Sequence, residues 1–190
     1  MISKLKFLLM MSVFLLTFAS TARAQTKEAE LWETLKTGNS VALMRHATAP
    51  GTGDPPGFQV DDCSTQRNLD QEGREQARGI GERFRERGIS KVKVYSSQWC
   101  RCLETARLLE LGEVTELPDL NSFFNDRSTE EAQTANMREF IDSYTGELPL
   151  MLVTHQVNVT ALTGIVPASG EIIVLRKTSD GVEVLGSIEN

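Results

Sequence analysis

Short runs of strand-forming residues alternate with segments of helical periodicity along most of the chain, and this alternation constrains the fold more than any other feature. Strands are predicted at 40–44, 91–97, 113–117 and 148–154, with a closing hairpin of 171–177 and 182–188 around Ser179-Asp180-Gly181. Helices are predicted at 27–37, 69–87, 99–111 and 128–145. Strands that alternate with helices predict a sheet covered by helices on both faces. We therefore expect an α/β fold, a three-layer α/β/α sandwich with a mostly parallel central sheet.

Residues 1–24 have the pattern of a secretory signal peptide. Lys4 and Lys6 give a positive start, an apolar stretch follows, and Ala22-Arg23-Ala24 is a small-x-small cleavage site. The alternatives are an uncleaved membrane anchor or a buried helix, but the apolar run is short for a bilayer span. We expect cleavage before Gln25, a single domain over 25–190, and a periplasmic or secreted mature protein.

The charge of the chain excludes two kinds of partner. The net charge is -6, and loss of 1–24 removes three positive charges and no negative ones, which leaves -9. An acidic chain without a Lys/Arg cluster is a poor candidate for nucleic-acid binding or for adsorption to an anionic membrane. We expect no nucleic-acid partner and no stable membrane insertion after cleavage. The oligomeric state does not follow from the sequence.

The two histidines of the chain stand at equivalent positions, each just after an apolar run. Arg45 and His46 follow "VALM", and His155 follows "LMLVT"; Arg101 lies shortly after the strand at 91–97. Catalytic groups of such folds lie beyond the carboxyl ends of parallel strands, so these side chains are expected to converge. Two imidazoles and two guanidinium groups in one pocket suit a phosphoryl dianion. The long irregular stretch 47–68, rich in Pro, Gly and Asp, is expected to form a functional loop beside them.

These motifs, taken in order, resemble the histidine phosphatase superfamily, which includes phosphoglycerate mutase-like and acid phosphatase-like enzymes. "LMRHAT" is similar to the family's strand followed by Arg-His, and "RNLDQEGREQAR" to its Leu-x-x-x-Gly-x-x-Gln-Ala helix start. "VYSSQWCRCLETA" resembles its Ser-Ser-x-x-x-Arg segment, and "LVTHQ" its second histidine. The matches run from about residue 40 to residue 164, and the resemblance implies the phosphoglycerate mutase-like fold.

The resemblance also implies a role for each residue. His46 is expected to attack phosphorus and form a phosphohistidine, while Arg45, Arg101 and His155 bind the phosphoryl group. No metal or other cofactor is expected. Taken alone, a histidine at a strand end is more often a structural hydrogen-bonding residue, and it is the ordered set that favours catalysis. The spacing of Trp99 and its helical neighbours Leu103, Ala106 and Leu109 is read as core packing, and Ser96 and Ser97 as turn and helix-capping residues.

The proton donor of the family is missing from both of its usual positions. Mutase-like members carry a glutamate where this chain has Ser122, and acid phosphatase-like members an aspartate where it has Gln156. Asp126 is the best local substitute, with Asp119 and Asp54 behind it. A surface role for Asp126 is an equal alternative.

Three cysteines in an oxidising compartment leave one thiol unpaired. Cys63 is expected to pair with Cys100 or Cys102, either of which would tie the long loop to the segment around Arg101. The helical face of Cys102 suits burial, which favours Cys63–Cys100. A zinc site is a weak alternative because the chain has two histidines and no paired CxxC.

The function expected from these features is hydrolysis of an extracytoplasmic phosphomonoester, either a small molecule or a glycan. The sequence is similar to exported bacterial lipopolysaccharide-core heptose phosphatases, which suggests a sugar-phosphate or lipopolysaccharide-type substrate. Two alternatives to this function stay open. One is an inactive phosphate-binding protein of the same fold, which the missing acid favours, and the other is a phosphotransferase.

Overall fold

A computed structural model describes residues 25–179 and 181–190. The expected signal peptide at 1–24 and Asp180 of the expected hairpin turn lie outside the described residues. Within the described residues, no helix is both long and apolar enough to cross a bilayer.

The protein is built on one six-stranded sheet in the order β3-β2-β4-β1-β5-β6. The strands are listed here in chain order: β1 (Ser40–Arg45), β2 (Lys93–Ser96), β3 (Val114–Glu116), β4 (Leu150–Thr154), β5 (Ile172–Thr178) and β6 (Gly181–Ile188). The first four strands are parallel to one another, and the β5–β6 hairpin adds to β1 in antiparallel orientation. The predicted mostly parallel sheet with a closing hairpin is confirmed.

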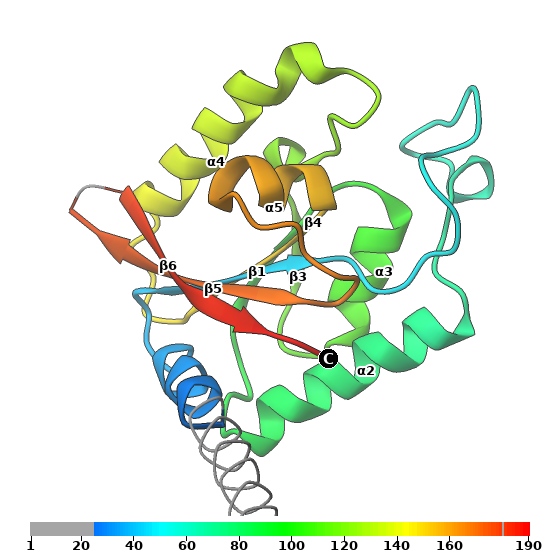
Figure 1. Cartoon of the computed structure of the whole chain (residues 1–190). Helices are drawn as coiled ribbons and strands as arrows, with labels where there is room; N and C mark the ends of the chain where they lie inside the picture. The colour runs from blue at the N-terminus through cyan, green and yellow to red at the C-terminus, as the bar shows by residue number, and fades with distance from the viewer. Residues whose placement is uncertain (1–24, 180) are drawn as a thin grey trace, which may run out of the picture.

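Helices cover both faces of the sheet (Figure 1). A helix over residues 25–34, α2 (Gln71–Glu86) and α3 (Cys100–Leu108) pack on one face, and α4 (Glu130–Ser143) and α5 (Gln156–Thr163) on the other. Alternate residues of β1 divide between these two layers, with Met44 in one core and Leu43 in the other. Each strand therefore contributes to two apolar cores, and the predicted three-layer sandwich is confirmed.

The sequence did not predict α5, which begins directly after the second histidine. Its eight residues, "QVNVTALT", include β-branched valine and threonine, which have low helix propensity, and no polar face repeats along them. The helix forms because Val159 and Leu162 pack into the sheet and Gly164, at φ 75°, ends it in the left-handed conformation. Tertiary packing here outweighs local propensity.

The start of α2 supports the segment that follows β1. Gly73 lies so close to this segment that a Cβ atom there would be 2.0 Å from the Thr48 carbonyl oxygen. Three residues on, the Gln76 side chain accepts the Thr48 N–H at 2.9 Å and donates to the Ser169 carbonyl. The glycine and glutamine of "EGREQA" thus hold the main chain just beyond His46.

The long loop 47–68 is irregular, as predicted, apart from one short turn, η1 (Cys63–Thr65). Polar side chains hold it together, since the Gln66 amide donates to the carbonyls of Gln59 and Val60, and the Arg67 Nε donates to that of Gly53 at 2.7 Å. The loop therefore has a defined shape beside the carboxyl end of the sheet.

Candidate active site

The register of the sheet brings the two histidines together. β1 pairs in parallel with β4 so that Arg45 lies opposite Thr154, and the next residues of the two strands are His46 and His155. Their ring centroids are 5.5 Å apart, and the His46 N–H donates to the Thr154 carbonyl at 2.9 Å. Arg101, in the first turn of α3 after β2, reaches the same point. The expected convergence of these four side chains at one edge of the sheet is present.

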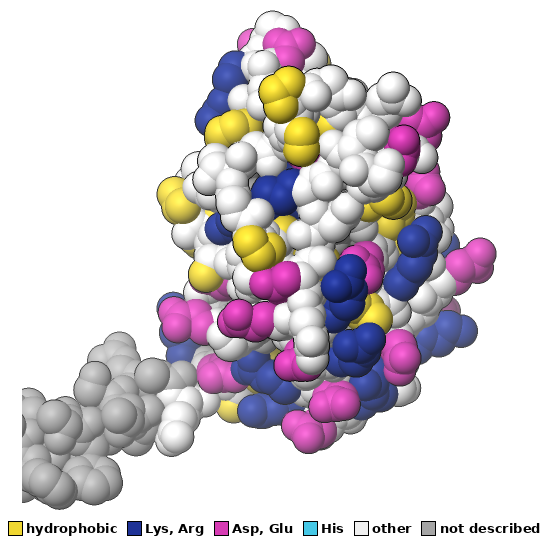
Figure 2. Space-filling view, turned by 90° about the vertical axis from the view of Figure 1, so that its right-hand side faces the viewer, with side chains coloured by type: hydrophobic (Ala, Val, Ile, Leu, Met, Phe, Trp, Pro, Cys, Tyr) yellow, Lys and Arg dark blue, Asp and Glu magenta, His cyan; other side chains and the backbone are white. Residues whose placement is uncertain are grey.

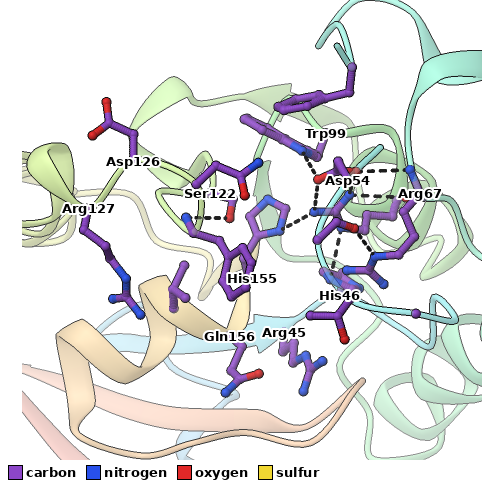
Figure 3. A pocket seen from close by; sticks show the side chains of 18 residues that line it. Arg45, His46, Asp54, Arg67, Trp99, Ser122, Asp126, Arg127, His155 and Gln156 are labelled. Carbon is purple, nitrogen blue, oxygen red and sulfur yellow. Dashed lines mark hydrogen bonds and ion pairs between the residues drawn. The ribbon is translucent and has the colours of Figure 1, made fainter. Parts of the chain in front are cut away.

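A cavity of about 350 Å³ opens over this edge. Figure 2 shows basic side chains recessed in a hollow of this face, and Figure 3 shows the residues that line the cavity. The floor of the cavity holds the two histidines, Arg45 and Arg101. The long loop contributes Asp54, Phe58 and Arg67, and the segment after β3 contributes residues 122 and 124–127.

The His46 ring is buried in its neutral form. Its Nδ1 lies 2.7 Å from the Ala47 carbonyl oxygen, which only accepts, so Nδ1 carries the proton and Nε2 has a lone pair that can accept a hydrogen bond. The ring is buried, and burial followed by the positive charge of Arg101 lowers its pKa to about 3. Nε2 is therefore unprotonated at neutral pH. It accepts a hydrogen bond from Arg101 Nε at 3.2 Å.

The His155 ring is oriented by a chain of hydrogen bonds. Arg101 Nη2, which only donates, lies 3.4 Å from Nδ1, so Nδ1 accepts and Nε2 carries the proton. Nε2 then donates to Ser97 Oγ at 2.9 Å, and Ser97 donates to Asn121 Oδ1 at 3.1 Å. Burial and the charge of Arg101 hold the His155 pKa well below its usual value.

The Arg101 guanidinium is fully hydrogen-bonded and nearly inaccessible. Its Nε and Nη2 face the two imidazoles, while its Nη1 and Nη2 hold the two carboxylate oxygens of Asp54 at 2.7 and 3.1 Å. Its Nη1 also donates to the Arg67 carbonyl at 3.2 Å. This ion pair is buried, with 3% of the Arg101 side chain and 5% of the Asp54 side chain exposed.

Arg45 is held by one contact and leaves one donor unused. Its Nη1 donates to the Pro167 carbonyl at 2.9 Å, but its buried Nε has no hydrogen-bond partner among the described residues. Burial and the charge of Arg101 lower its pKa without removing its proton at neutral pH. A half-buried guanidinium that lines the cavity and carries an unpaired N–H is suited to an anionic ligand.

The predicted acid Asp126 lies at the rim of the cavity, away from the histidines. Its Oδ1 accepts from the Ser128 N–H at 3.0 Å and from the Ser128 hydroxyl at 2.6 Å, and these bonds lower its pKa. In Figure 3 its carboxylate points away from both imidazoles. Ser122 and Gln156 also line the cavity, but Asp119 does not. The role of Asp126 as proton donor stays a prediction.

The structure adds functional contacts that the sequence did not indicate. Arg67 brings a third guanidinium to the cavity, and no pattern in the loop sequence distinguished it from a surface arginine. Trp99 belongs to the core as predicted, yet its Nε1 also donates to Asp54 at 3.0 Å. The N-cap of α3 is Trp99 itself, so the predicted capping role of the two serines is wrong; Ser97 instead holds His155. Only tertiary packing brings these partners together.

The cysteine prediction is confirmed. Cys63 and Cys100 form a disulfide, with their Cα atoms 5.6 Å apart, and Cys102 is a buried free thiol beside His155. Burial raises the pKa of the Cys102 thiol to about 12, so it stays protonated. Within the described residues, no cluster of three His, Cys, Asp or Glu side chains is arranged to hold a metal ion.

Several solved structures of similar fold carry phosphatase names. A putative phosphohistidine phosphatase SixA from Agrobacterium tumefaciens is 19% identical, with a TM-score of 0.57 over 80% of this chain and 99% of that one. A phosphoserine phosphatase from Entamoeba histolytica, in complex with phosphoserine, is 11% identical, with a TM-score of 0.59 over 78% and 95%. A putative alpha-ribazole-5'-P phosphatase from Escherichia coli is 15% identical, with a TM-score of 0.62 over 76% and 94%.

No curated protein matches the sequence of this chain. At these low identities the solved structures show a shared fold and no more. The family assignment comes from a family model: the model of the histidine phosphatase superfamily, branch 1, matches residues 41–146, which is more than half of the chain. That match runs from the strand before His46 past Arg101 to the end of α4. The chain belongs to branch 1 of the histidine phosphatase superfamily.

Proposed function

We propose that this protein is an exported, metal-independent phosphomonoesterase that works through a phosphohistidine on His46. The observation that carries the proposal is that one buried guanidinium, Arg101, meets His46 Nε2 through its Nε and His155 Nδ1 through its Nη2. In the proposed complex the phosphoryl group takes the place of these two hydrogen bonds, with phosphorus facing His46 Nε2 and its oxygens bound to Nε and Nη2 of Arg101.

The chemistry proceeds in two displacements. His46 Nε2 attacks phosphorus, the N–P bond forms as the bond to the ester oxygen breaks, and the leaving alcohol takes a proton from an acid. Water then attacks phosphorus, the N–P bond breaks to restore the imidazole, and the carboxylate left by the acid takes the proton of the water as inorganic phosphate is released. Arg45 and Arg101 stabilise the charge on the equatorial oxygens in both steps, and most of the catalysis is electrostatic.

The proposed proton donor is Asp126. Among the described residues, the carboxyl groups lining the cavity are Asp54 and Asp126. Asp54 is a buried partner of Arg101, and the guanidinium holds both of its carboxylate oxygens, so it is a poor proton donor. Asp126 is exposed at the rim, and a rotation about its side chain separates it from Ser128.

A sugar phosphate or a phosphorylated glycan is the proposed substrate class. The mouth of the cavity carries Phe58 and Phe124, the latter 50% exposed, which offer flat apolar surfaces to a ring beyond the phosphate. The names of similar structures include phosphatases for phosphoserine and ribazole phosphate, which are small monoesters. The Cys63–Cys100 disulfide supports an oxidising compartment and hence export.

The test is phosphate release by residues 25–190 from an aryl phosphate and a panel of sugar phosphates, with and without EDTA. We expect activity that EDTA leaves unchanged and that His46→Ala lowers by about 10³-fold or more. Arg101→Ala is expected to lose about 10²–10³-fold, while Arg107→Ala, on the exposed side of the same helix, retains wild-type rates. Enzyme quenched in alkaline detergent, which preserves the acid-labile N–P bond, should carry phosphate on histidine.

Two other results would change the proposal. A folded wild type that binds tungstate but releases phosphate from no ester would indicate the inactive phosphate-binding protein. Faster product formation with an added alcohol, accompanied by a phosphorylated alcohol, would indicate a phosphotransferase.

A further inference from the structure

We infer that Asp54 is a positioning residue that aims Arg101 at the transferring phosphoryl group, an inference that rests on the proposed phosphatase function. Asp54 comes from the long loop, eight residues after His46 and 47 residues before Arg101, and it forms the buried ion pair on which the orientation of Arg101 depends. It acts through Arg101 and does not touch the reacting atoms.

The two edges of the guanidinium have separate partners. The edge formed by Nη1 and Nη2 holds both oxygens of Asp54, while the edge formed by Nε and Nη2 faces His46 Nε2 and His155 Nδ1. A phosphoryl group entering between the two imidazoles meets only the second edge. Asp54 can therefore stay bound to Arg101 while the substrate is held.

The carboxylate of Asp54 is itself fixed from several directions. Oδ1 accepts the main-chain N–H of Arg67 at 3.1 Å as well as Arg101 Nη1, and Oδ2 accepts Trp99 Nε1 at 3.0 Å as well as Arg101 Nη2. Each oxygen thus has two donors, which leaves no lone pair for a substrate proton. This saturation suits a fixed anchor and disfavours a proton donor.

The loop that carries Asp54 is tied to the same helix as Arg101. Arg67 binds the carbonyls of Gly53 and Ala49, and the Cys63–Cys100 disulfide joins the far part of the loop to the residue before Arg101. The Cys100 N–H also donates to the Gln66 side chain at 3.0 Å. Loop and guanidinium therefore share one rigid frame.

The electrostatic need for Asp54 follows from the crowding of cations. Arg45, Arg67 and Arg101 line one cavity, and burial and mutual repulsion lower the pKa of Arg45 and Arg67. One carboxylate on the far edge of Arg101 offsets part of this repulsion and keeps the side chain in one rotamer. The Arg101 side chain is thus ordered when the protein folds, so substrate binding does not carry the entropic cost of ordering it.

The experiment compares Asp54→Ala with the matched control Asp61→Asn, an exposed aspartate of the same loop. Rates are measured on aryl and alkyl phosphates whose leaving groups differ in pKa, and tungstate affinity is measured by calorimetry. We expect Asp54→Ala to lower kcat/KM by about 10²-fold, equally for all leaving groups, and to weaken tungstate binding. Added formate should restore part of the activity by refilling the guanidinium fork. Asp61→Asn should match the wild type.

Three outcomes would overturn the inference. A loss confined to alkyl phosphates would make Asp54 the proton donor, a gain in tungstate affinity would make it a competitor of the phosphate, and unchanged rates and affinity would leave it no role in the site. If the wild type binds tungstate but hydrolyses nothing, the proposed function fails and the tungstate comparison alone decides the role of Asp54.

A second variant keeps the test open if Asp54→Ala does not fold. Trp99→Phe removes the indole N–H bonded to Asp54 and keeps a ring against Phe58, whose centroid lies 5.4 Å away. We expect a loss of several-fold, again independent of the leaving group. An unchanged rate and tungstate affinity in this variant would count against the inference.

Discussion

The chemistry of His46 depends on its immediate neighbours. Donation of the Nδ1 proton to the Ala47 carbonyl leaves Nε2 as the hydrogen-bond acceptor, and burial and the charge of Arg101 disfavour protonation of the ring. His155 is held in the opposite tautomer by Ser97 and Arg101. Two chemically identical side chains thus take opposite tautomers, because different partners occupy their ring nitrogens.

At the same scale lies the proton donor, which we test with Asp126→Asn. Aryl phosphates have stable leaving groups and need little protonation, whereas alkyl phosphates need a proton on the departing oxygen. We expect the variant to slow alkyl esters by about 10²-fold and aryl esters by less than about threefold. The measurement is kcat/KM across a series of leaving groups, and equal losses on both classes would remove Asp126 from the role.

At the scale of elements, the site is assembled where the ends of β1, β2 and β4 meet the first turn of α3 and the long loop. The parallel register of β1 and β4 sets the spacing of the histidines, and the disulfide ties the loop to α3. The loop has few apolar contacts of its own, so its position depends on this covalent tie and on the bonds of Gln66 and Arg67. The element with the least regular structure thus provides two of the charged groups of the cavity.

Loss of the disulfide should therefore affect both stability and activity. We expect the Cys63→Ser/Cys100→Ser double variant to lose about 3–4 kcal/mol of unfolding free energy, from the freed chain entropy of the cross-linked loop. Its kcat/KM should also fall, because Asp54 is no longer held against Arg101. Urea unfolding and steady-state kinetics measure the two effects.

Reduction of the wild type provides the control for this experiment. Dithiothreitol should bring the wild type to the stability of the double variant and leave the double variant itself unchanged. A response of the double variant to the reductant would assign the effect to Cys102 instead.

At the scale of the whole molecule, the three-layer fold buries titratable and charged side chains at the carboxyl edge of its sheet. Both histidines are buried and neutral, and four arginines line one cavity together with a single buried carboxylate. The folded state therefore disfavours protonation of these imidazoles, whereas in the unfolded chain they would take up protons in mild acid. The stability of the whole domain is thereby coupled to pH.

The sign of this coupling follows from the lowered pKa values. A histidine whose folded pKa lies below its unfolded value of 6.5 takes up its proton on unfolding, so stability is highest above pH 6.5 and falls as the pH drops below it. For His46, with a folded pKa of about 3, the loss at pH 5 is about 2 kcal/mol relative to pH 7. The lowered pKa of Asp54 acts only near and below its ordinary value of 3.8, outside this range.

Urea unfolding at pH 7 and pH 5 checks this prediction. The wild type should lose stability between the two pH values, and His46→Asn should lose about 2 kcal/mol less, because it lacks one of the two titrating rings. Equal losses in the two proteins would show that His46 is protonated in the folded state.

The sequence by itself determined the order of the strands and of every described α-helix except α5, the three-layer architecture, and the meeting of Arg45, His46, Arg101 and His155 at one edge of the sheet. These follow from local periodicity and from the rule that parallel strands end at a common edge, both of which can be read along the chain. The disulfide partner of Cys63 followed from the helical face of Cys102 in the same way. Signals of this kind involve residues within one or two turns of each other.

Only the tertiary structure decided the rest of the site. Asp54, Arg67, Ser97 and Asn121 acquire their roles through contacts with residues 24 to 58 positions away, and α5 forms by packing on the sheet. No local pattern marks such residues, because an aspartate in an irregular loop has the same composition and neighbours whether it is solvated or buried against an arginine. Its function follows from the desolvation and hydrogen bonding that the folded chain imposes on it.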